Sequence, residues 1–269
     1  MICKICASGT KHAFSAKVLR KYSAEFFCCP ECGFLFASDP CWLEEAYSSA
    51  IADADTGLVA RNIDISRRLS CVLYLYGSDP VSGRYLDIAG GYGMLTRLMR
   101  DVGFDFYWFD RYCENLLAKG FEFSKEHHGC RAITAMEVIE HVSDPVSFIE
   151  ESLSFGGAEM LIFTTELFEG VPPNPGAWWY YTFETGQHIS FYQRRTLEAI
   201  AKRLGLKFVS ARGLHILSRK KVNEQVLRWA THPVVSRLGE IWVRRRLDSK
   251  TVPDHKLMLS RSLHVDSVQ

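Results

Sequence analysis

The stretch Tyr85-Leu-Asp-Ile-Ala-Gly-Gly-Tyr-Gly93 decides the fold, because it has the pattern of a short buried strand followed by a glycine turn. Its three glycines accept backbone angles that other residues resist, so a ligand can lie almost against the main chain. Apolar residues then recur at helical spacing from Met94 to Val102. The pattern predicts a strand, a tight turn and a helix that together cradle a ligand.

An acidic residue closes the next predicted strand. The apolar run Phe106 to Phe109 ends in Asp110, the place where an acidic side chain accepts hydrogen bonds from a ribose diol in dinucleotide-type folds. A nicotinamide fingerprint would continue to a third glycine at position 96, where this chain has Thr96. The turn is also preceded by the acidic Asp87. These features predict a nucleoside cofactor that has no pyrophosphate.

The glycine stretch resembles motif I of the class I S-adenosylmethionine (SAM) methyltransferases, Asp/Glu-x-Gly-x-Gly-x-Gly. Asp87, Gly91 and Gly93 are in register with that motif, and Ala89 stands where the first glycine is usual. The resemblance implies SAM as cofactor, bound by these four residues and Asp110. The methyl group of Ala89 is expected to crowd the methionine end of the cofactor. On the loop alone, an ordinary strand-to-helix turn is the competing interpretation.

A second informative stretch runs from Ala132 to Pro145 and predicts a buried strand with polar residues at its carboxyl end. Ligands in open α/β sheets bind outside such strand ends. The run Glu137-Val-Ile-Glu-His141 resembles motif IV of the same methyltransferases, which implies that Glu137 belongs to the cofactor site. By itself, a pair such as Glu140 and His141 is more often a polar network that holds the loop than a catalytic pair.

Five of the nine cysteines lie within the first 33 residues. Cys3 and Cys6 form one Cys-x-x-Cys knuckle and Cys29 and Cys32 form another. Each spacing lets two thiolates converge on one tetrahedral ion, so the four cysteines predict one structural Zn²⁺ in a small zinc ribbon. Cys28 is the spare thiol. Buried or redox-active thiols are the alternative interpretation.

A proline-rich aromatic loop, residues 171–183, predicts either a substrate wall or a hydrophobic flap packed on the sheet. Two knuckles, the core and a loop that ends in a His-hydrophobic-x-Phe pattern together resemble the nucleotide-sugar C-methyltransferases. This resemblance implies that His188 is the general base, although a histidine that braces the loop is the alternative. Tyr47, in a segment that often covers methyltransferase active sites, and His141 are the next candidates for a catalytic role.

The whole chain is predicted as an α/β protein with a seven-stranded Rossmann-like class I methyltransferase sheet. Residues 206–210 and 215–218 form its closing antiparallel pair. The predicted domains are a zinc-binding module (1–40), a helical cover segment (41–80), the methyltransferase domain (81–220), and a helical C-terminal extension with a tail (221–269).

The composition limits the partners. The net charge is +1, from 32 basic and 31 acidic residues, so no global field attracts a polyanion and nucleic acid is not favoured. No apolar run approaches the length of a membrane span, and the N-terminus lacks the apolar core of a signal peptide. A cytoplasmic location is expected, and the oligomeric state stays open.

Three functions compete at this level. The first is SAM-dependent methylation of a small or polymer-bound sugar, including a nucleotide-sugar, at carbon or oxygen. The second is a zinc-ribbon RNA methyltransferase, which the knuckles fit and the charge balance does not. The third is a non-catalytic zinc-binding interaction module on a degenerate methyltransferase scaffold, to which Ala89 points.

Overall fold

The computed structural model describes residues 1–47, 55–76 and 80–266. Ser48 and Ser49, which follow the predicted active-site residue Tyr47, lie outside the described residues. The described chain divides into two compact units that alternate along the sequence. The first unit comprises Met1–Asp55, Ala135–Phe155 and Glu159–Asn223, and the second comprises Thr56–Thr134, Gly156–Ala158 and Glu224–Gln269.

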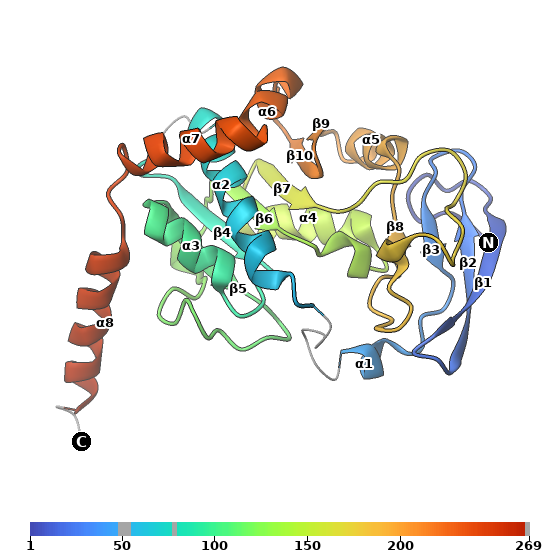
Figure 1. The fold of residues 1–269 in the computed structure, drawn as a ribbon, viewed down its shortest axis with the longest axis horizontal. Coiled ribbons are helices and arrows are strands. Elements are labelled where there is room, and N and C mark those ends of the chain that lie inside the picture. The colour runs from blue at the N-terminus through green and yellow to red at the C-terminus, as the bar shows by residue number, and fades with distance from the viewer. Residues whose placement is uncertain (48–54, 77–79, 267–269) are drawn as a thin grey trace. The chain divides into compact units, whose positions relative to one another are not determined.

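A mixed sheet of six strands has the order β5-β4-β6-β7-β10-β9. Its strands are β4 (Arg84–Ile88), β5 (Asp105–Phe109), β6 (Ala132–Ala135), β7 (Met160–Thr164), β9 (Lys207–Ala211) and β10 (Leu214–Ser218). β4 pairs in parallel with β5 and β6, whereas β10 pairs antiparallel with β7 and β9. This arrangement confirms the α/β class and the antiparallel closing pair (Figure 1).

The predicted seven-stranded sheet needs correction, because the described residues give this sheet six strands. At the β5 edge, the described residues add an isolated bridge between Trp108 and Glu122 and no further strand. The amide of Trp108 donates to the carbonyl of Phe121 (2.9 Å), and the amide of Phe123 donates to the carbonyl of Trp108 (2.7 Å). The capped turn η1 (Lys125–His127) begins directly afterwards, with the Ser124 amide bonded to His127 Nδ1. The pairing therefore stops before a seventh strand can form.

The first unit also contains a four-stranded antiparallel sheet of order β1-β2-β3-β8. Its strands are β1 (Lys11–Val18), β2 (Tyr22–Cys28), β3 (Leu35–Ala37) and β8 (Ser190–Phe191), and β3 pairs with β8 through Leu35 opposite Phe191. The last strand thus comes from a segment far along the chain. The helical elements of this unit are α1 (Leu43–Ala46), η2 (Ile139–His141), α4 (Pro145–Gly156), η3 (Trp179–Tyr181) and α5 (Arg194–Arg203).

The aromatic loop packs on this smaller sheet. Tyr180 and Tyr181 are buried together with Phe26, Trp42 and Phe191 in one hydrophobic cluster, and the Trp42 indole donates to the carbonyl of Gly186 at 2.8 Å. Tyr180 and Tyr181 of the loop are therefore packed, on the four-stranded sheet, whereas Val171 and Trp179 are exposed. The loop joins the N-terminal segment to the segment that carries His188.

The second unit places helices beside β4 and β5. Its helices are α2 (Leu58–Tyr76), α3 (Met94–Val102), α6 (Glu224–Ala230), α7 (Pro233–Arg244) and α8 (Thr251–Asp266). α2 packs against α3, α6 and α7, and α3 packs on β5. The apolar residues Leu69, Val72 and Leu73 of α2 are buried, as the helical pattern of the sequence predicts. None of the described helices combines the length and the apolarity needed to cross a membrane.

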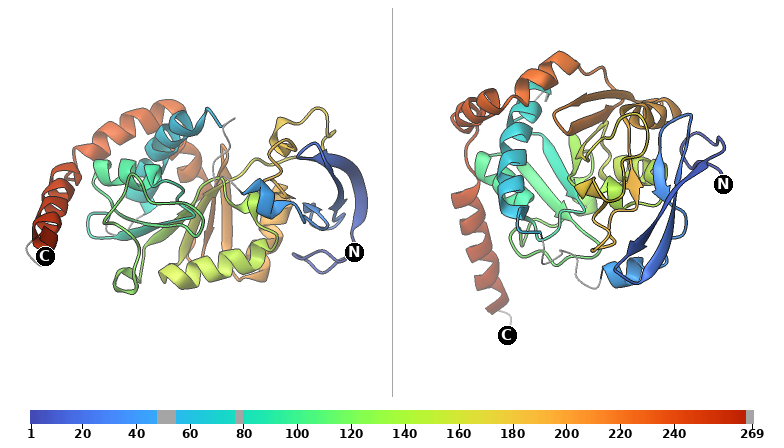
Figure 2. Two further views of the ribbon diagram at one scale, coloured as in Figure 1. Left: turned by 90° about the horizontal axis from the view of Figure 1, so that it is seen from below. Right: turned by 45° about the vertical axis from the view of Figure 1, so that its right-hand side comes forward.

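The polar tail after Lys250 forms the helix α8, which extends away from the other helices of this unit (Figure 2). Its first turn is fastened by Asp254, whose carboxylate accepts bonds from Nε and Nη2 of the buried Arg100, both at 2.8 Å. Burial by itself raises the pKa of Asp254, but the bonds from Arg100 hold that pKa below its ordinary value. A bidentate pair with both partners buried fixes the helix more firmly than an exposed pair would.

Candidate functional site

The glycine loop after β4 turns through three left-handed residues, Ala89 (φ 55°), Gly91 (φ 55°) and Gly93 (φ 86°). Alanine in this region is strained by about 1 kcal/mol or more, because its Cβ approaches the following carbonyl. A Cβ built on Gly91 would meet no atom within 4 Å, whereas one on Gly93 would lie 2.8 Å from Asn115 Oδ1. The loop is open at Gly91, as a cradle for a ligand must be.

Asp110, at the end of β5, is oriented toward this loop. Its Oδ2 accepts the Gly91 amide at 2.9 Å, and its Oδ1 accepts the amides of Tyr112 (2.7 Å) and Cys113 (2.9 Å). Three backbone donors fix the carboxylate in one direction, and Oδ2, which accepts one amide, retains a site for another donor. Asp87, Ala89, Gly91, Gly93 and Asp110 are therefore brought together in the second unit.

Asp87 lies beneath the loop. It is buried and accepts hydroxyl bonds from Thr134 (2.7 Å) and Thr96 (3.3 Å). Burial raises the pKa of Asp87 to about 7, although the threonine bonds oppose the shift. Thr96, which occupies the position of the third glycine of a nicotinamide fingerprint, thus helps to hold the acidic residue of the motif. Sequence reasoning missed this role of Thr96 and that of Thr134.

Glu137 follows β6 in the first unit. It has φ 54°, a rare conformation for a residue with a side chain, and its amide donates to Thr164 Oγ1 at 2.8 Å. Such strain persists only where surrounding bonds impose it and is concentrated at functional sites. The assignment of Glu137 to the cofactor site stays a prediction.

Four residues of the first unit form what we call the histidine cluster: Tyr47, Glu140, His141 and His188. The Tyr47 hydroxyl and His141 Nδ1 lie 2.8 Å apart, and the rings of His141 and His188 meet edge to face with their centroids 4.8 Å apart. The three predicted catalytic residues, Tyr47, His141 and His188, therefore lie together although they come from three distant parts of the sequence.

The tautomer of His188 follows from its bond to the backbone. Its Nδ1 lies 2.7 Å from the carbonyl oxygen of Tyr180, so Nδ1 carries the hydrogen and donates it. A neutral His188 therefore has its lone pair on Nε2. In the same cluster, burial and then the charge of His188 lower the pKa of His141 to about 3, which keeps His141 neutral near pH 7.

Glu140 is fully buried, with an exposed fraction of 0%. Its Oε1 accepts the Tyr180 hydroxyl at 2.7 Å, but Oε2 is buried without a hydrogen-bond partner among the described residues. Burial and the neighbouring charge of Glu137 raise the pKa of Glu140 to about 8. Glu140 is thus part of a polar network through Oε1, while Oε2 has no hydrogen-bond partner among the described residues.

Tyr180 joins the network, and sequence reasoning did not single it out. Its hydroxyl bonds Glu140 and lies 3.1 Å from the Thr165 hydroxyl, while its carbonyl accepts His188. His215 contacts this network at Thr165, because its Nε2 donates to the Thr165 carbonyl (3.0 Å). Its Nδ1 accepts the Ser210 hydroxyl (2.9 Å). The signal in the sequence was the aromatic loop, which gives no hint of which tyrosine turns inward.

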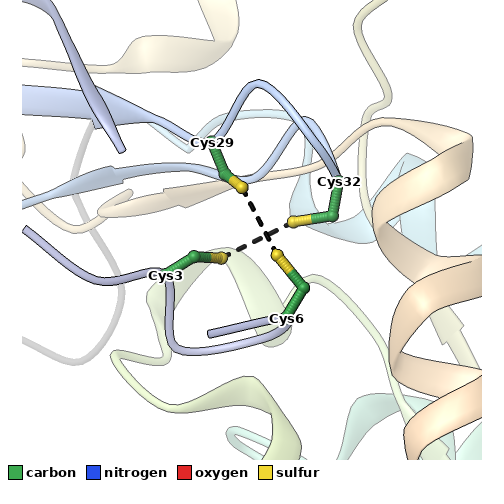
Figure 3. A group of neighbouring side chains, drawn as sticks. All are labelled: Cys3, Cys6, Cys29 and Cys32. Atoms are coloured by element: carbon green, nitrogen blue, oxygen red, sulfur yellow. Dashed lines mark hydrogen bonds between the residues drawn. The ribbon is translucent and has the colours of Figure 1, made fainter. Parts of the chain in front are cut away.

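The four predicted cysteine ligands converge in the first unit, and Figure 3 shows their sulfurs pointing toward one another. The sulfurs of Cys3 and Cys32 are 3.5 Å apart and those of Cys6 and Cys29 are 3.4 Å apart. Around a zinc ion with Zn–S bonds of about 2.3 Å, tetrahedral sulfurs stand about 3.8 Å apart, so the cluster fits the ion closely. Cys28 lies outside the cluster and points to its neighbour's carbonyl.

Both knuckles have the same backbone. The residue after the second cysteine is left-handed in each, Ala7 at φ 60° and Gly33 at φ 75°. In the second knuckle the Gly33 amide donates to the carbonyl of Cys29 (2.8 Å), and the Cys29 amide donates to the carbonyl of Phe34 (2.9 Å). The turns hold each pair of thiols in place from the backbone, which is what a zinc knuckle requires.

Comparison with known families identifies the class. The family model described as "Methyltransferase domain" matches residues 61–211, more than half of the 269-residue chain. The chain therefore belongs to this family of methyltransferase domains. It is an enzyme of the methyltransferase class.

Among solved structures, the chain is similar to TnmH, with 17% identity, coverage of 68% of this chain and 62% of TnmH, and a TM-score of 0.48. It is also similar to an O-methyltransferase family 2 protein from Planctomyces limnophilus in complex with apigenin (17% identity, 68% and 66% coverage, TM-score 0.43). A third similar structure is magnesium protoporphyrin IX methyltransferase from Synechocystis with bound SAM (13% identity, coverage of 66% of this chain and 91% of that one, TM-score 0.39). The match spans less than two thirds of TnmH. No curated protein matches the chain.

Proposed function

We propose that this methyltransferase transfers the methyl group of SAM to a carbon or a hydroxyl oxygen of a sugar-type acceptor, either small or polymer-bound. The observation that supports the proposal best is the histidine cluster, in which the bond from His188 Nδ1 to a carbonyl leaves the lone pair on Nε2. Such a lone pair suits removal of a proton from a hydroxyl or from a carbon beside a ketone. The two cysteine knuckles support a sugar acceptor through the resemblance to nucleotide-sugar C-methyltransferases.

We propose that the SAM-binding site is formed by five residues of β4, the glycine loop and the end of β5, with Glu137 as a further contact. The five are Asp87, Ala89, Gly91, Gly93 and Asp110. The ribose hydroxyls would donate to the oriented Asp110 carboxylate, and the open main chain at Gly91 would accommodate the nucleoside. The buried Asp87 would act through the loop that it braces. SAM supplies an electrophilic methyl group on a sulfonium sulfur.

For the chemical step, we propose His188 as the general base. As the acceptor atom forms its bond to the methyl carbon, its own proton passes to His188 Nε2, and the electrons of the carbon–sulfur bond stay on sulfur. The imidazolium that forms is stabilised by the Tyr180 carbonyl that accepts its Nδ1–H. The Tyr47 hydroxyl, bonded to His141, would orient the acceptor.

Labelled-SAM turnover against a panel of nucleotide keto-sugars, free sugars and RNA tests the acceptor class. Turnover on the sugars alone is expected. Turnover on RNA alone, with strong loss of binding on adding salt, would replace the sugar with a polynucleotide. SAM binding without turnover on any acceptor of the panel would contradict the sugar assignment.

For the four-cysteine cluster, we propose one structural zinc ion held by Cys3, Cys6, Cys29 and Cys32. Burial raises the pKa of Cys3 and of Cys32, and a cation bound among the four sulfurs would stabilise their thiolate forms. Four thiolates complete a tetrahedron and leave no open position, which is the arrangement of a structural site. The zinc would hold the N-terminal sheet in shape.

A further inference from the structure

Outside the four cysteines, another set of metal-donor side chains converges in the described part of the chain. One donor atom each from Glu140, His141 and His188 lies within 4.8 Å of the other two. We propose that these three side chains bind a divalent cation of the first transition row, with two imidazoles and one carboxylate on one face of the ion. This arrangement leaves coordination positions open for a substrate.

The orphan oxygen of Glu140 is the first argument. A wholly buried carboxylate is costly unless each oxygen is compensated. Oε1 has the Tyr180 hydroxyl, but Oε2 has no hydrogen-bond partner among the described residues. A buried polar atom without a partner needs an explanation, and an ion that the structure does not contain is one of the few available. A cation bound at Oε2 would complete the environment of this side chain.

The outer contacts of the two imidazoles are the second argument. Ligating histidines usually engage their other ring nitrogen with a carbonyl, a carboxylate or water, which fixes the ring and its tautomer. His188 donates Nδ1–H to the carbonyl of Tyr180 (2.7 Å), and His141 Nδ1 lies 2.8 Å from the Tyr47 hydroxyl. The His188 ring is therefore held through Nδ1, and Nε2 is the donor that it would offer to a cation.

The side chains must draw together to bind the ion. Three ligands on one face of a cation, each about 2.1 Å from it, stand about 3.0 Å apart, so donor atoms that lie within 4.8 Å of one another must close by up to about 1.8 Å. Nitrogen and carboxylate donors suit Mn²⁺, Fe²⁺ or Co²⁺, whereas the four thiolates select softer ions. The two clusters of the first unit would therefore hold different metals.

The consequence for catalysis rests on the proposed function, although the binding itself does not. A cation held by His188 Nε2 would replace this nitrogen as the group that activates a hydroxyl acceptor, while the metal-free protein would use Nε2 as the base. The cation would lower the pKa of that hydroxyl, so that its proton would pass to solvent near neutral pH. The oxygen would then form its bond to the methyl carbon while the electrons of the breaking carbon–sulfur bond stayed on sulfur.

Titration with Mn²⁺ tests the site, using full-length protein whose cysteine cluster is loaded with zinc. Electron paramagnetic resonance is expected to show one saturable equivalent of bound Mn²⁺. Glu140→Gln keeps the shape of the side chain and removes its charge, and it should weaken this binding by at least about tenfold. Glu184→Gln is the matched control, because Glu184 is an exposed carboxylate of the same segment as His188 and should leave binding unchanged.

Because Glu140 is buried, His188→Asn provides a second variant at a half-buried position. Retained Mn²⁺ binding in a folded His188→Asn protein, equal weakening by Glu140→Gln and Glu184→Gln, or no saturable binding to the wild type would each overturn the site. Methyl transfer to a sugar without Mn²⁺ binding would refute this inference and leave the proposed function standing. One bound Mn²⁺ without turnover on any sugar would do the reverse.

Discussion

The four-cysteine cluster and the histidine cluster lie in the same unit, and they differ in how completely their donor atoms are matched. The four thiols form a closed set whose spacing suits a tetrahedral ion. The histidine cluster has three donors and one buried oxygen without a partner among the described residues. Closed sets stabilise a fold, whereas sets with open positions perform chemistry. The difference separates a structural role from a chemical one within a single unit.

The largest effect is expected in the four-cysteine cluster. Cys29→Ser should lower the zinc content from one equivalent to none and unfold the N-terminal sheet, because structural zinc contributes on the order of 10 kcal/mol in small modules. Metal analysis and circular dichroism measure both changes. Cys28→Ser is the matched control, since Cys28 is outside the cluster. Loss of zinc in Cys28→Ser with retention in Cys29→Ser would show that the ligands are misassigned.

The next largest effect is expected in the histidine cluster. His188→Asn should lower turnover by roughly a hundredfold to ten-thousandfold, the usual contribution of a general base. SAM affinity and melting temperature should stay close to those of the wild type, because the side chain is only half buried. Labelled-SAM turnover and calorimetry measure the two quantities. If turnover persists at the wild-type level, the acceptor's proton leaves by another route, with Tyr47 and His141 the next candidates.

Asp87 is a buried carboxyl whose two oxygens both have hydrogen-bond partners, so it can be compared with Glu140. Asp87 has both oxygens bonded to threonines, and burial raises its pKa to about 7. The folded protein keeps this proton where the unfolded chain, with a pKa of about 3.9, has lost it. The unfolding free energy should therefore decrease as the pH rises from about 4 to about 7.

Asp87→Asn removes that contribution, because asparagine stays neutral. Between about pH 5 and pH 8 the stability of the wild type relative to the variant should fall by about 2 to 3 kcal/mol. Urea unfolding at both pH values measures the change, and the exposed Glu114→Gln gives the control. A difference that does not vary with pH would mean that Asp87 is ionised throughout.

The smallest effect separates cofactor binding from acceptor chemistry. Asp110→Ala should weaken SAM binding by at least about tenfold, since a charge-assisted bond contributes about 1.5 to 3 kcal/mol. Calorimetric titration with SAM measures the affinity. Because Asp110 also accepts three backbone amides, Asp110→Asn serves as the control that keeps the side chain's shape. Unchanged affinity in Asp110→Ala would remove this residue from the cofactor site.

Much of this arrangement could be predicted from short stretches of sequence. The cofactor loop spans nine consecutive residues, and the knuckles pair cysteines two residues apart, so local backbone geometry is enough to bring their groups together. The count of seven strands was wrong: the sequence assigned no segment to a seventh strand, and among the described residues the edge at β5 has an isolated bridge from Trp108 to Glu122 in its place.

The sequence by itself determined the class of fold, the glycine loop with its acidic partner, and the convergence of four thiols, because each depends on contacts or turns within a short length of chain. Only the tertiary structure decided that Tyr47, Glu140, His141 and His188 meet, that Tyr180 rather than a neighbouring aromatic turns inward, and that one oxygen of Glu140 lacks a partner among the described residues. The Tyr47–His141 contact joins residues 94 positions apart, and the nearby bond from Gln187 to the carbonyl of Ala46 spans 141 positions. Side chains so distant meet only through the packing of whole elements, which no local pattern encodes.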